Sequence, residues 1–433
     1  MKRLAGLILL TAILATSCTT YDKSWETSPT TTREAIPELD LPEQPQTDPF
    51  AEGLVTAFYT GLLGRSPLQE ELDVTALQLS TGTISPQDVV REILGTEEFQ
   101  AIVLSNTGYV ERLCTGLLGQ DANETAEDYW IWRMENGTTR EEVAEAFMSY
   151  QEFADYCSAY GYLPEEEEEE YIFEEITEDE VPDVVSATRD AIGSADEGEF
   201  ITTFGDYDPG ITTLEQIGEA LAELDESGYD VGFVLVDLRT GRGIAFNPDQ
   251  TFYTASSIKC PYAASFCALN PDSVENWENT IQNMLINSDN DAYTSLNGAY
   301  GRQYIKQWCE EAGIDPSPCN YKYPYLSSRD MSLLWLRNYE FFITDPVGQE
   351  VCEWFQEPTY SVIREVVGEM YITQSKGGWL VDEEPRHRTT CDSGIVYADN
   401  GTYIVSITSD VPSTFDPLIP LMEALNAAHD EMC

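Results

Sequence analysis

The sequence predicts a multidomain protein, in which an N-terminal all-α repeat domain precedes a C-terminal α+β domain with helices flanking an antiparallel sheet. A motif at residues 58–65 returns 55 residues later, which is typical of repeated helical units. Residues 231–246 and 389–410 follow strand patterns broken by turn signals, and helical patterns surround both stretches. At 433 residues, the chain is long enough to form a separate core in each domain.

The composition limits the partners that the chain can have. Its 78 acidic and 22 basic residues give a formal net charge of −56. Nucleic acids and anionic membrane surfaces attract basic proteins, so we expect neither as a partner. We interpret the acid excess as a solvated, self-repelling surface. An anionic substrate would then need a local cluster of positive charge.

Residues 1–18 have the pattern of an export signal. Lys2 and Arg3 precede an apolar stretch, Leu4–Leu14, which is too short to span a bilayer as a stable helix. The small residues before Cys18 resemble the processing box of lipoproteins, in which this cysteine is lipidated. We expect an exported, extracytoplasmic protein that reaches the cell membrane only through a lipid on Cys18, with plain signal cleavage before Cys18 as the alternative.

The cysteines agree with export. The chain has ten cysteines and no Cys-x-x-Cys pair that would indicate zinc. Outside the membrane several of them should form disulfides, and Cys114 with Cys157 and Cys309 with Cys319 are candidate pairs. Without Cys18 the count is odd, so at least one thiol stays free or bonds another chain.

The repeat domain is expected over residues 49–160. The sequence FYTGLLGR at 58–65 returns as LCTGLLGQ at 113–120, and a second match, ending at Phe99 and Phe153, has an offset of 54 residues. Apolar residues at helical spacing lie between glycine-containing breaks, so each unit should form a few short helices. The pattern resembles the DUF4214 family, a helical module of secreted and surface proteins. It would act as an interaction or anchoring module, or only as a helical spacer.

Two segments without a hydrophobic period should connect the parts. Residues 19–48, rich in Thr, Pro and Glu, predict a disordered tether, and residues 161–195 predict an acidic linker. The six consecutive glutamates at Glu165–Glu170 repel one another and extend the chain. The spaced ligands and central glycine of a calcium-binding EF-hand loop are not found in this linker.

The C-terminal domain is expected over residues 196–433. Its hydrophobic periods and turn signals predict a helix at 213–224, strands at 231–237 and 243–246, helical segments up to about residue 342, a hairpin over 389–410 and a helix at 420–430. The turn of the second hairpin carries Asn400-Gly401, a strong hairpin signal.

The helix that follows the first hairpin begins with Ser256-Ser257-Ile258-Lys259. Residues three apart lie on one face of a helix, so Ser256 and Lys259 should point the same way. A serine hydroxyl is a poor nucleophile until a base takes its proton, and a desolvated lysine with a lowered pKa can do so. Of the six lysines in the chain, Lys259 alone has a serine three positions before it. An isolated Ser-x-x-Lys also fits an ordinary amphipathic helix.

Two further motifs follow in an informative order. Ser288-Asp289-Asn290 comes 32 residues after Ser256, and Lys376-Gly377-Gly378-Trp379 comes 88 residues after Ser288. The set resembles the Ser-x-x-Lys, Ser-Asp-Asn and Lys-Thr-Gly motifs of the penicillin-recognising serine hydrolases, with class A β-lactamases as the nearest branch. The resemblance covers about residues 210–430 and includes the flanking stretches at 327–330 and 391–396.

The resemblance implies a fold, a reaction and a substrate class. The C-terminal domain would have a β-lactamase-like α+β fold with a helical subdomain. It would transfer the acyl group of β-lactams or D-Ala-D-Ala-type amides through an acyl-serine intermediate, without a cofactor. The substrate would be a β-lactam or a small peptide, such as a cell-wall peptide.

The resemblance also assigns catalytic roles. Ser256 would attack the amide carbonyl while Lys259 takes its proton. The backbone N–H groups of Ser256 and Trp379 would form the oxyanion hole, and removal of one such donor typically costs about 10²–10³ in rate. Ser288 would pass a proton to the leaving nitrogen. Lys376 would supply positive potential for a substrate carboxylate.

Substrate binding would fall to Asn290, which would hold the substrate amide, and to the strand that carries Gly377, Gly378 and Trp379. Gly377 departs from the family pattern, because the family has Thr or Ser there. The hydroxyl that would bind a substrate carboxylate is therefore missing.

A second departure concerns deacylation. Class A β-lactamases carry a Glu-x-x-Leu-Asn loop ahead of the Ser327 region, and its glutamate activates the deacylating water. Between Asn290 and Ser327 this chain has Glu310 and Glu311 but no such motif, and we interpret both as solvated. We expect slow deacylation, which favours a D,D-peptidase-like or penicillin-binding activity over fast antibiotic hydrolysis, with a base that these motifs do not identify as the alternative.

The sequence also bears on three alternatives to a lysine-activated serine: a Ser-His-Asp triad, a metal site and a non-catalytic role. A Ser-His-Asp triad would need His387 or His429, the only histidines, and no Gly-x-Ser-x-Gly elbow accompanies them. Two histidines without ligand spacing predict no metal site. The alternative from another class is a non-catalytic cell-surface binding or anchoring protein that keeps a degenerate β-lactamase-like fold.

Overall fold

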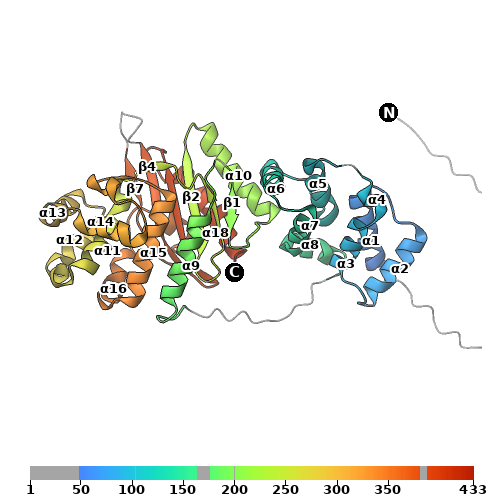
Figure 1. Ribbon diagram of the computed structural model, residues 1–433, viewed down its shortest axis with the longest axis horizontal. Coiled ribbons are helices and arrows are strands. Elements are labelled where there is room, and N and C mark those ends of the chain that lie inside the picture. The colour runs from blue at the N-terminus through green and yellow to red at the C-terminus, as the bar shows by residue number, and fades with distance from the viewer. Residues whose placement is uncertain (1–47, 103, 163–175, 199, 381–387) are drawn as a thin grey trace, which may run out of the picture. The chain divides into compact units, whose positions relative to one another are not determined.

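The computed structural model describes residues 48–102, 104–162, 176–198, 200–380 and 388–433 (Figure 1). The predicted export signal, the lipidation at Cys18, the glutamate run and His387 lie outside these residues, as does all of the predicted tether except its last residue. Among the helices that are described, none combines the length and the apolar character needed to cross a membrane.

The N-terminal part of the described chain is helical, as the sequence predicts. Its elements are α1 (Pro49–Leu63), α2 (Gln69–Ser80), α3 (Pro86–Leu94), α4 (Glu97–Gln100), α5 (Asn106–Leu113), the π-helical η1 (Cys114–Leu118), α6 (Glu124–Glu135), α7 (Arg140–Ser149) and α8 (Gln151–Ala159). Asp48, Ser85 and Thr139 start α1, α3 and α7, because each side chain accepts a hydrogen bond from a backbone N–H of the first turn.

Two glycines of the repeated sequence motif lie against each other. Gly61, near the end of α1, approaches Gly116 in η1 so closely that a Cβ on Gly61 would overlap the Cα of Gly116. A Cβ on Gly116 would lie 2.9 Å from a side-chain carbon of Leu62. Both copies of the motif therefore need glycine at this position for α1 and η1 to pack.

The C-terminal half of the predicted acidic linker, residues 161–195, forms a helix instead. Residues 163–175 lie outside the described residues, but α9 (Val181–Ser194) occupies most of what remains of the segment. Val181, Val185 and Ile192 form a buried stripe on α9 that packs in the same core as α15 (Ser328–Thr344). The acidic residues between these apolar positions masked the helical period in the sequence.

The C-terminal domain contains a seven-stranded antiparallel sheet within the described residues. The strand order is β1-β3-β2-β9-β8-β6, and the short β7 pairs with β8. Their bounds are β1 (Thr202–Phe204), β2 (Val231–Asp237), β3 (Gly243–Phe246), β6 (Ile372–Ser375), β7 (Gly378–Leu380), β8 (Thr389–Ala398) and β9 (Gly401–Ser409). A separate two-stranded ribbon joins β4 (Thr251–Tyr253) to β5 (Tyr325–Ser327).

Helices cover both faces of this sheet (Figure 1). Alternate residues of β2 face opposite ways. Phe233 and Leu235 pack with residues of α10 (Ile211–Glu226) and α18 (Ile419–Asp430), whereas Val234 and Val236 pack with α9, α15 and α11 (Lys259–Leu269). The sheet is therefore the middle layer of an α+β domain.

A helical subdomain lies between β4 and β6 in the sequence, as predicted. It contains the 3₁₀ turn η2 (Ala255–Ile258), then α11, η3 (Pro271–Ser273), α12 (Val274–Ile286), α13 (Asn290–Tyr300), α14 (Gln303–Ala312), η4 (Ser317–Asn320), α15, α16 (Pro346–Val351), η5 (Cys352–Phe355) and α17 (Val362–Val367). Ser327 caps α15 and shares a capping box with Asp330.

The strands and helices predicted for the C-terminal domain form close to the expected positions. β2 and β3 have the predicted bounds. α10 is two residues longer than predicted at each end, and α18 begins one residue earlier than predicted. The predicted second hairpin forms as β8 and β9, which pair on either side of Asp399-Asn400.

The nine cysteines after Cys18 are free thiols in the structure. Cys309 Sγ and Cys319 Sγ lie 3.6 Å apart between α14 and η4, in contact but not bonded. Cys114 and Cys157 are both buried in the helical part of the chain. The predicted disulfides are not formed here, and they stay predictions.

Candidate active site

Ser256 lies in η2, a strained turn that leads directly into α11. Ala255 has a φ of 44°, which is uncommon for a residue with a side chain. The turn is anchored by Thr254, whose N–H and hydroxyl both donate to the backbone oxygen of Pro324 at 3.0 and 2.9 Å. Ser256 is partly exposed, so that a substrate can reach it.

Lys259, three residues later, is fully buried. Residues three apart eclipse each other in a 3₁₀ turn, so Ser256 and Lys259 extend from the same side of η2. The Lys259 Nζ donates to the backbone oxygen of Ser288 at 2.6 Å and to Asn290 Oδ1 at 2.8 Å. Burial lowers the pKa of Lys259 to about 7, and the positive charges of Lys376 and Lys322 contribute to the same shift. Near neutral pH this amine can therefore accept a proton.

The Ser288-Asp289-Asn290 motif forms the turn that faces Lys259. Ser288 has a φ of 56°, and Asp289 caps α13 by accepting a hydrogen bond from the N–H of Ala292 at 2.6 Å. This cap fixes the start of α13, so that Asn290 and the backbone oxygen of Ser288 both reach the lysine. Ser288 Oγ lies 3.4 Å from the same nitrogen. The first two sequence motifs thus share one cluster.

The third motif joins this cluster through its backbone. Gly378, the first residue of β7, lies so close to η2 that a Cβ there would be 2.6 Å from the backbone nitrogen of Ser256 and would overlap Thr254 O and Ser257 N. Glycine is therefore required at this position. Trp379 follows in β7 and pairs with Thr390 of β8. The backbone of Ser256 lies beside β7, where the sequence predicts the oxyanion hole.

Lys376 is buried and lies two residues before the start of β7. Its Nζ donates to the backbone oxygen of Gly377 at 2.9 Å, and burial lowers its pKa, against the opposing effects of Cys260 and Asp392. Asp392 is fully buried on β8, and burial raises the pKa of its carboxyl to about 6. Ser361 Oγ donates to this carboxylate at 2.6 Å. Lys376 therefore adds a cation to the cluster and has an acidic group near it.

The atoms around Gly377 explain why this position lacks the threonine or serine side chain that the family has. A Cβ at Gly377 would lie 2.6 Å from the ring of Phe415 and 2.6 Å from the backbone oxygen of Tyr360. Both aromatic rings pack on Trp379, with centroids 4.5 Å away for Tyr360 and 5.8 Å away for Phe415. An aromatic group fills the space where a threonine side chain would stand.

The structure adds Lys322 and Tyr323, which sequence reasoning missed. Both residues lie between Asn290 and Ser327, the span in which class A β-lactamases carry the deacylating glutamate. The Lys322 Nζ donates to Thr294 Oγ1 at 2.6 Å and lies 5.2 Å from the ring centre of Tyr323. The Tyr323 hydroxyl donates to Asn290 Oδ1 at 3.2 Å. The scarcity of lysine was the available signal, since Lys322 is one of only six.

The two acids of the preceding helix do not serve this cluster. Glu310 and Glu311 are exposed on α14, as predicted. Glu311 forms an ion pair with Arg337 at 3.0 Å and accepts a hydrogen bond from Gln307. The acid that acts on Lys259 is Asp289, which is committed to capping α13.

The sequence of the C-terminal domain matches a known family. Residues 214–270 and 268–428 match the Beta-lactamase enzyme family. Residues 92–157 match the Domain of unknown function (DUF4214), which covers the second predicted repeat unit and the end of the first. No match was found among curated proteins.

Solved structures of similar fold cover about half of the chain. A β-lactamase from Chitinophaga pinensis is 14% identical and covers 50% of this chain and 98% of its own, with a TM-score of 0.42. PBP-A is 15% identical and covers 50% of this chain and 96% of its own, with a TM-score of 0.42. A class A β-lactamase from Clostridium kluyveri is 15% identical and covers 50% of this chain and 99% of its own, with a TM-score of 0.41.

Proposed function

We propose that the C-terminal domain, which belongs to the β-lactamase enzyme family, is a serine hydrolase that opens β-lactam or D-Ala-D-Ala-type amides through an acyl-Ser256 intermediate. One observation carries the proposal. Lys259 is buried three residues after Ser256, and its Nζ is held by both Ser288 and Asn290. We infer that this buried amine, whose pKa is lowered to about 7, is the base that takes the proton of Ser256.

Acylation proceeds in two steps. The Ser256 oxygen bonds to the amide carbonyl carbon while its proton passes to the neutral amine of Lys259. The oxyanion that forms is stabilised by the backbone N–H groups of Ser256 and Trp379. The carbon–nitrogen bond then breaks, and the leaving nitrogen takes the proton from Lys259 through the hydroxyl of Ser288. Ser256 is left as an acyl ester.

Two lysines supply local positive charge beside the base. Lys376 and Lys322 both act on Lys259, within a chain whose net charge is −56. They can attract a substrate carboxylate that the rest of the surface repels. Because Phe415 and Tyr360 fill the space beside Gly377, such a carboxylate relies on Lys322 or Lys376 rather than on a threonine hydroxyl.

Deacylation is slow in this proposal. A water molecule must attack the acyl ester, and a general base typically contributes about 10²–10⁴-fold to such a step. Lys322 and Tyr323 occupy the span where class A enzymes place a glutamate, and a cation cannot take that role. The acyl-enzyme would persist, as in a penicillin-binding protein or a D,D-peptidase with a slow second step.

The rest of the chain is proposed to hold this domain outside the cell. Export and a lipid on Cys18 would tether it to the membrane. The helices of the N-terminal part support two repeated units, because α2 and α6 start 55 residues apart and have 12 residues each. We propose an anchoring or spacing role for them, and a disulfide between Cys309 and Cys319 in the oxidising exterior.

A non-catalytic binding protein is the second candidate, favoured by the Phe415 ring and the Tyr360 backbone oxygen that fill the space beside Gly377. Labelling with a fluorescent penicillin separates the two. A covalent adduct in the wild type that is lost in Ser256→Ala and reduced by a D-Ala-D-Ala peptide supports the hydrolase. Failure of the folded wild type to label overturns it.

A further inference from the structure

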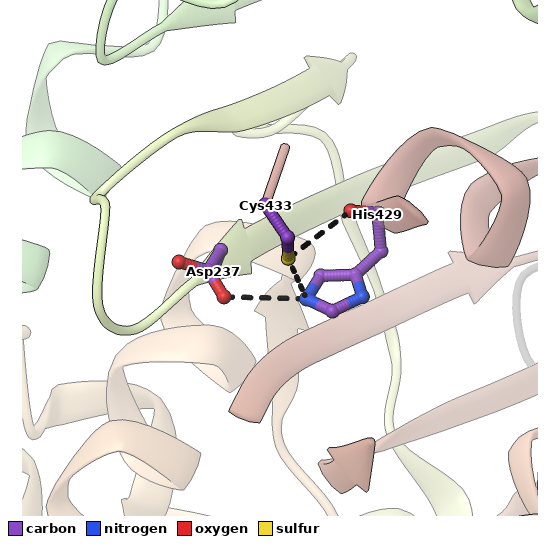
Figure 2. Close-up of side chains that lie close together, drawn as sticks. All are labelled: Asp237, His429 and Cys433. Carbon is purple, nitrogen blue, oxygen red and sulfur yellow. Dashed lines mark hydrogen bonds and ion pairs between the residues drawn. The ribbon is translucent and has the colours of Figure 1, made fainter. Parts of the chain in front are cut away.

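Three side chains that could bind a metal ion lie close together (Figure 2). Asp237 is the last residue of β2, His429 lies in the last turn of α18, and Cys433 follows that helix. His429 Nε2 lies 3.2 Å from Asp237 Oδ2 and 3.5 Å from Cys433 Sγ. All three ligand atoms lie within 4.8 Å of one another. Both partners therefore converge on one nitrogen of the ring, although Asp237 and His429 are 192 residues apart in the sequence.

Two of the three separations match the edges of a tetrahedral zinc site, and the third, between Asp237 Oδ2 and Cys433 Sγ, is within 4.8 Å. Zinc binds sulfur at about 2.3 Å, imidazole nitrogen at about 2.0–2.1 Å and carboxylate oxygen at about 2.0–2.2 Å. At tetrahedral angles these lengths place nitrogen about 3.3–3.4 Å from oxygen and about 3.5–3.6 Å from sulfur. The observed separations of 3.2 and 3.5 Å are within a few tenths of an ångström of both.

Gly401 leaves space beside the same three atoms. A Cβ at Gly401 would lie 2.6 Å from Asp237 Oδ2, 3.2 Å from Cys433 Sγ and 3.3 Å from His429 Nε2. Because Gly401, the first residue of β9, has no side chain, the space next to the three ligand atoms stays open.

The remaining contacts hold the ligands in place. Asp237 Oδ1 accepts hydrogen bonds from the N–H and the hydroxyl of Thr240, both at 2.7 Å, which leaves Oδ2 for the cluster. The ring of Tyr403 packs against His429, with the centroids 4.1 Å apart and the planes inclined at 34°, and limits its movement. Asp237 and His429 are buried, whereas Cys433 is half-buried and gives an ion and a water ligand access to the site.

The local charge suits a cation. The carboxylate of Asp237 is buried within the cluster, and a divalent ion would offset its negative charge.

We propose that Asp237, His429 and Cys433 bind one Zn²⁺ ion, with water as the fourth ligand. The ion joins the β2–β3 turn to the end of α18 and clamps the last helix onto the sheet. The residues are separate from those of the candidate active site, so the ion is structural. The sequence predicted no metal, because ligands so far apart have no recognisable spacing.

Cobalt substitution tests the site without any activity assay. The full-length protein is titrated with Co²⁺ alone and then with Zn²⁺, and the absorption spectrum is recorded. Wild type should show a thiolate-to-cobalt band and tetrahedral visible bands at one ion per chain, and Zn²⁺ should displace both. Cys433→Ser should lose the thiolate band, whereas the control Cys352→Ser, which replaces a partly exposed cysteine outside the cluster, should keep it.

Thermal unfolding gives a second readout. Zn²⁺ should raise the Tm of wild type and of Cys352→Ser but not that of Cys433→Ser, because an ion that binds only the folded state stabilises it. A wild-type protein with no thiolate band and no Zn²⁺-dependent shift overturns the proposal and leaves a hydrogen-bonded cluster. Equal binding by Cys433→Ser would assign the ions to the acidic surface instead.

Discussion

The Nζ of Lys259 lies 2.8 Å from the side-chain oxygen of Asn290, 31 residues further along the chain. Together with the backbone oxygen of Ser288, this contact uses two hydrogens of the amine. A neutral amine has two hydrogens and one lone pair, so both hydrogens are held in place and the lone pair is left for the proton of Ser256. The proposed reaction rests on this arrangement.

The first prediction concerns pH. Burial lowers the pKa of Lys259 to about 7 in the folded protein, and an unperturbed lysine has a pKa of about 10.4. The base is therefore protonated and inactive below pH 7 and neutral above it. The rate of acylation by a penicillin should fall about tenfold per pH unit below 7 and level off above it. Stopped-flow or quenched labelling from pH 5 to pH 9 measures this, and a rate that still rises steeply at pH 9 would rule out Lys259 as the base.

The second prediction concerns Lys322, whose positive charge lowers the pKa of Lys259. In Lys322→Met that charge is gone, so the pKa of Lys259 should rise. The midpoint of the acylation profile should then move to higher pH, so that the rate falls by a larger factor at pH 6 than at pH 9. Lys306→Met is the matched control, because Lys306 is bonded to Asn320 on the surface. A profile that moves equally in both variants would show that Lys322 has no specific effect.

Local patterns were sufficient to predict much of the sheet and its flanking helices. The bounds of β2 and β3 follow from an apolar run ended by the Arg239–Arg242 turn, and both lie where predicted. The stretch at 327–330, which resembles the family pattern, starts a helix whose cap needs only residues three positions apart. Such features depend on neighbours in the sequence, which a single chain displays.

Features that depend on distant residues could not be predicted. Lys322 faces the cluster only because the span before Ser327 folds against α13, and nothing in that span signals it. Gly377 could be identified as a departure, but the groups that fill its space, the ring of Phe415 and the backbone oxygen of Tyr360, come from separate segments. The Asp237 and His429 pair likewise forms only in three dimensions.

The third prediction concerns the filled space at Gly377. Gly377→Ala places a methyl group against the Phe415 ring and the backbone oxygen of Tyr360, and such overpacking typically costs about 1–3 kcal/mol in the free energy of unfolding. In a Phe415→Ala background the same change should cost less, because one of the two obstacles is gone. Urea unfolding of the four proteins in this cycle measures the difference.

Gly298→Ala serves as the control for that cycle. Gly298 lies within α13, and a Cβ there meets no atom within 4 Å. Alanine is favoured over glycine in a helix interior by about 1 kcal/mol at most, so this variant should be as stable as wild type or more stable. If Gly377→Ala is equally harmless, the aromatic group does not fill the space as described.

The most direct test of the central claim is the intact mass of the protein over time after mixing with benzylpenicillin. Wild type and Ser265→Ala, which removes a buried serine of the following helix α11, should each gain the mass of one penicillin and keep it long after free penicillin is removed. Ser256→Ala should gain nothing. A wild-type protein that gains no mass, or a Ser256→Ala variant that gains the same mass as wild type, would contradict the assignment of Ser256 as the nucleophile.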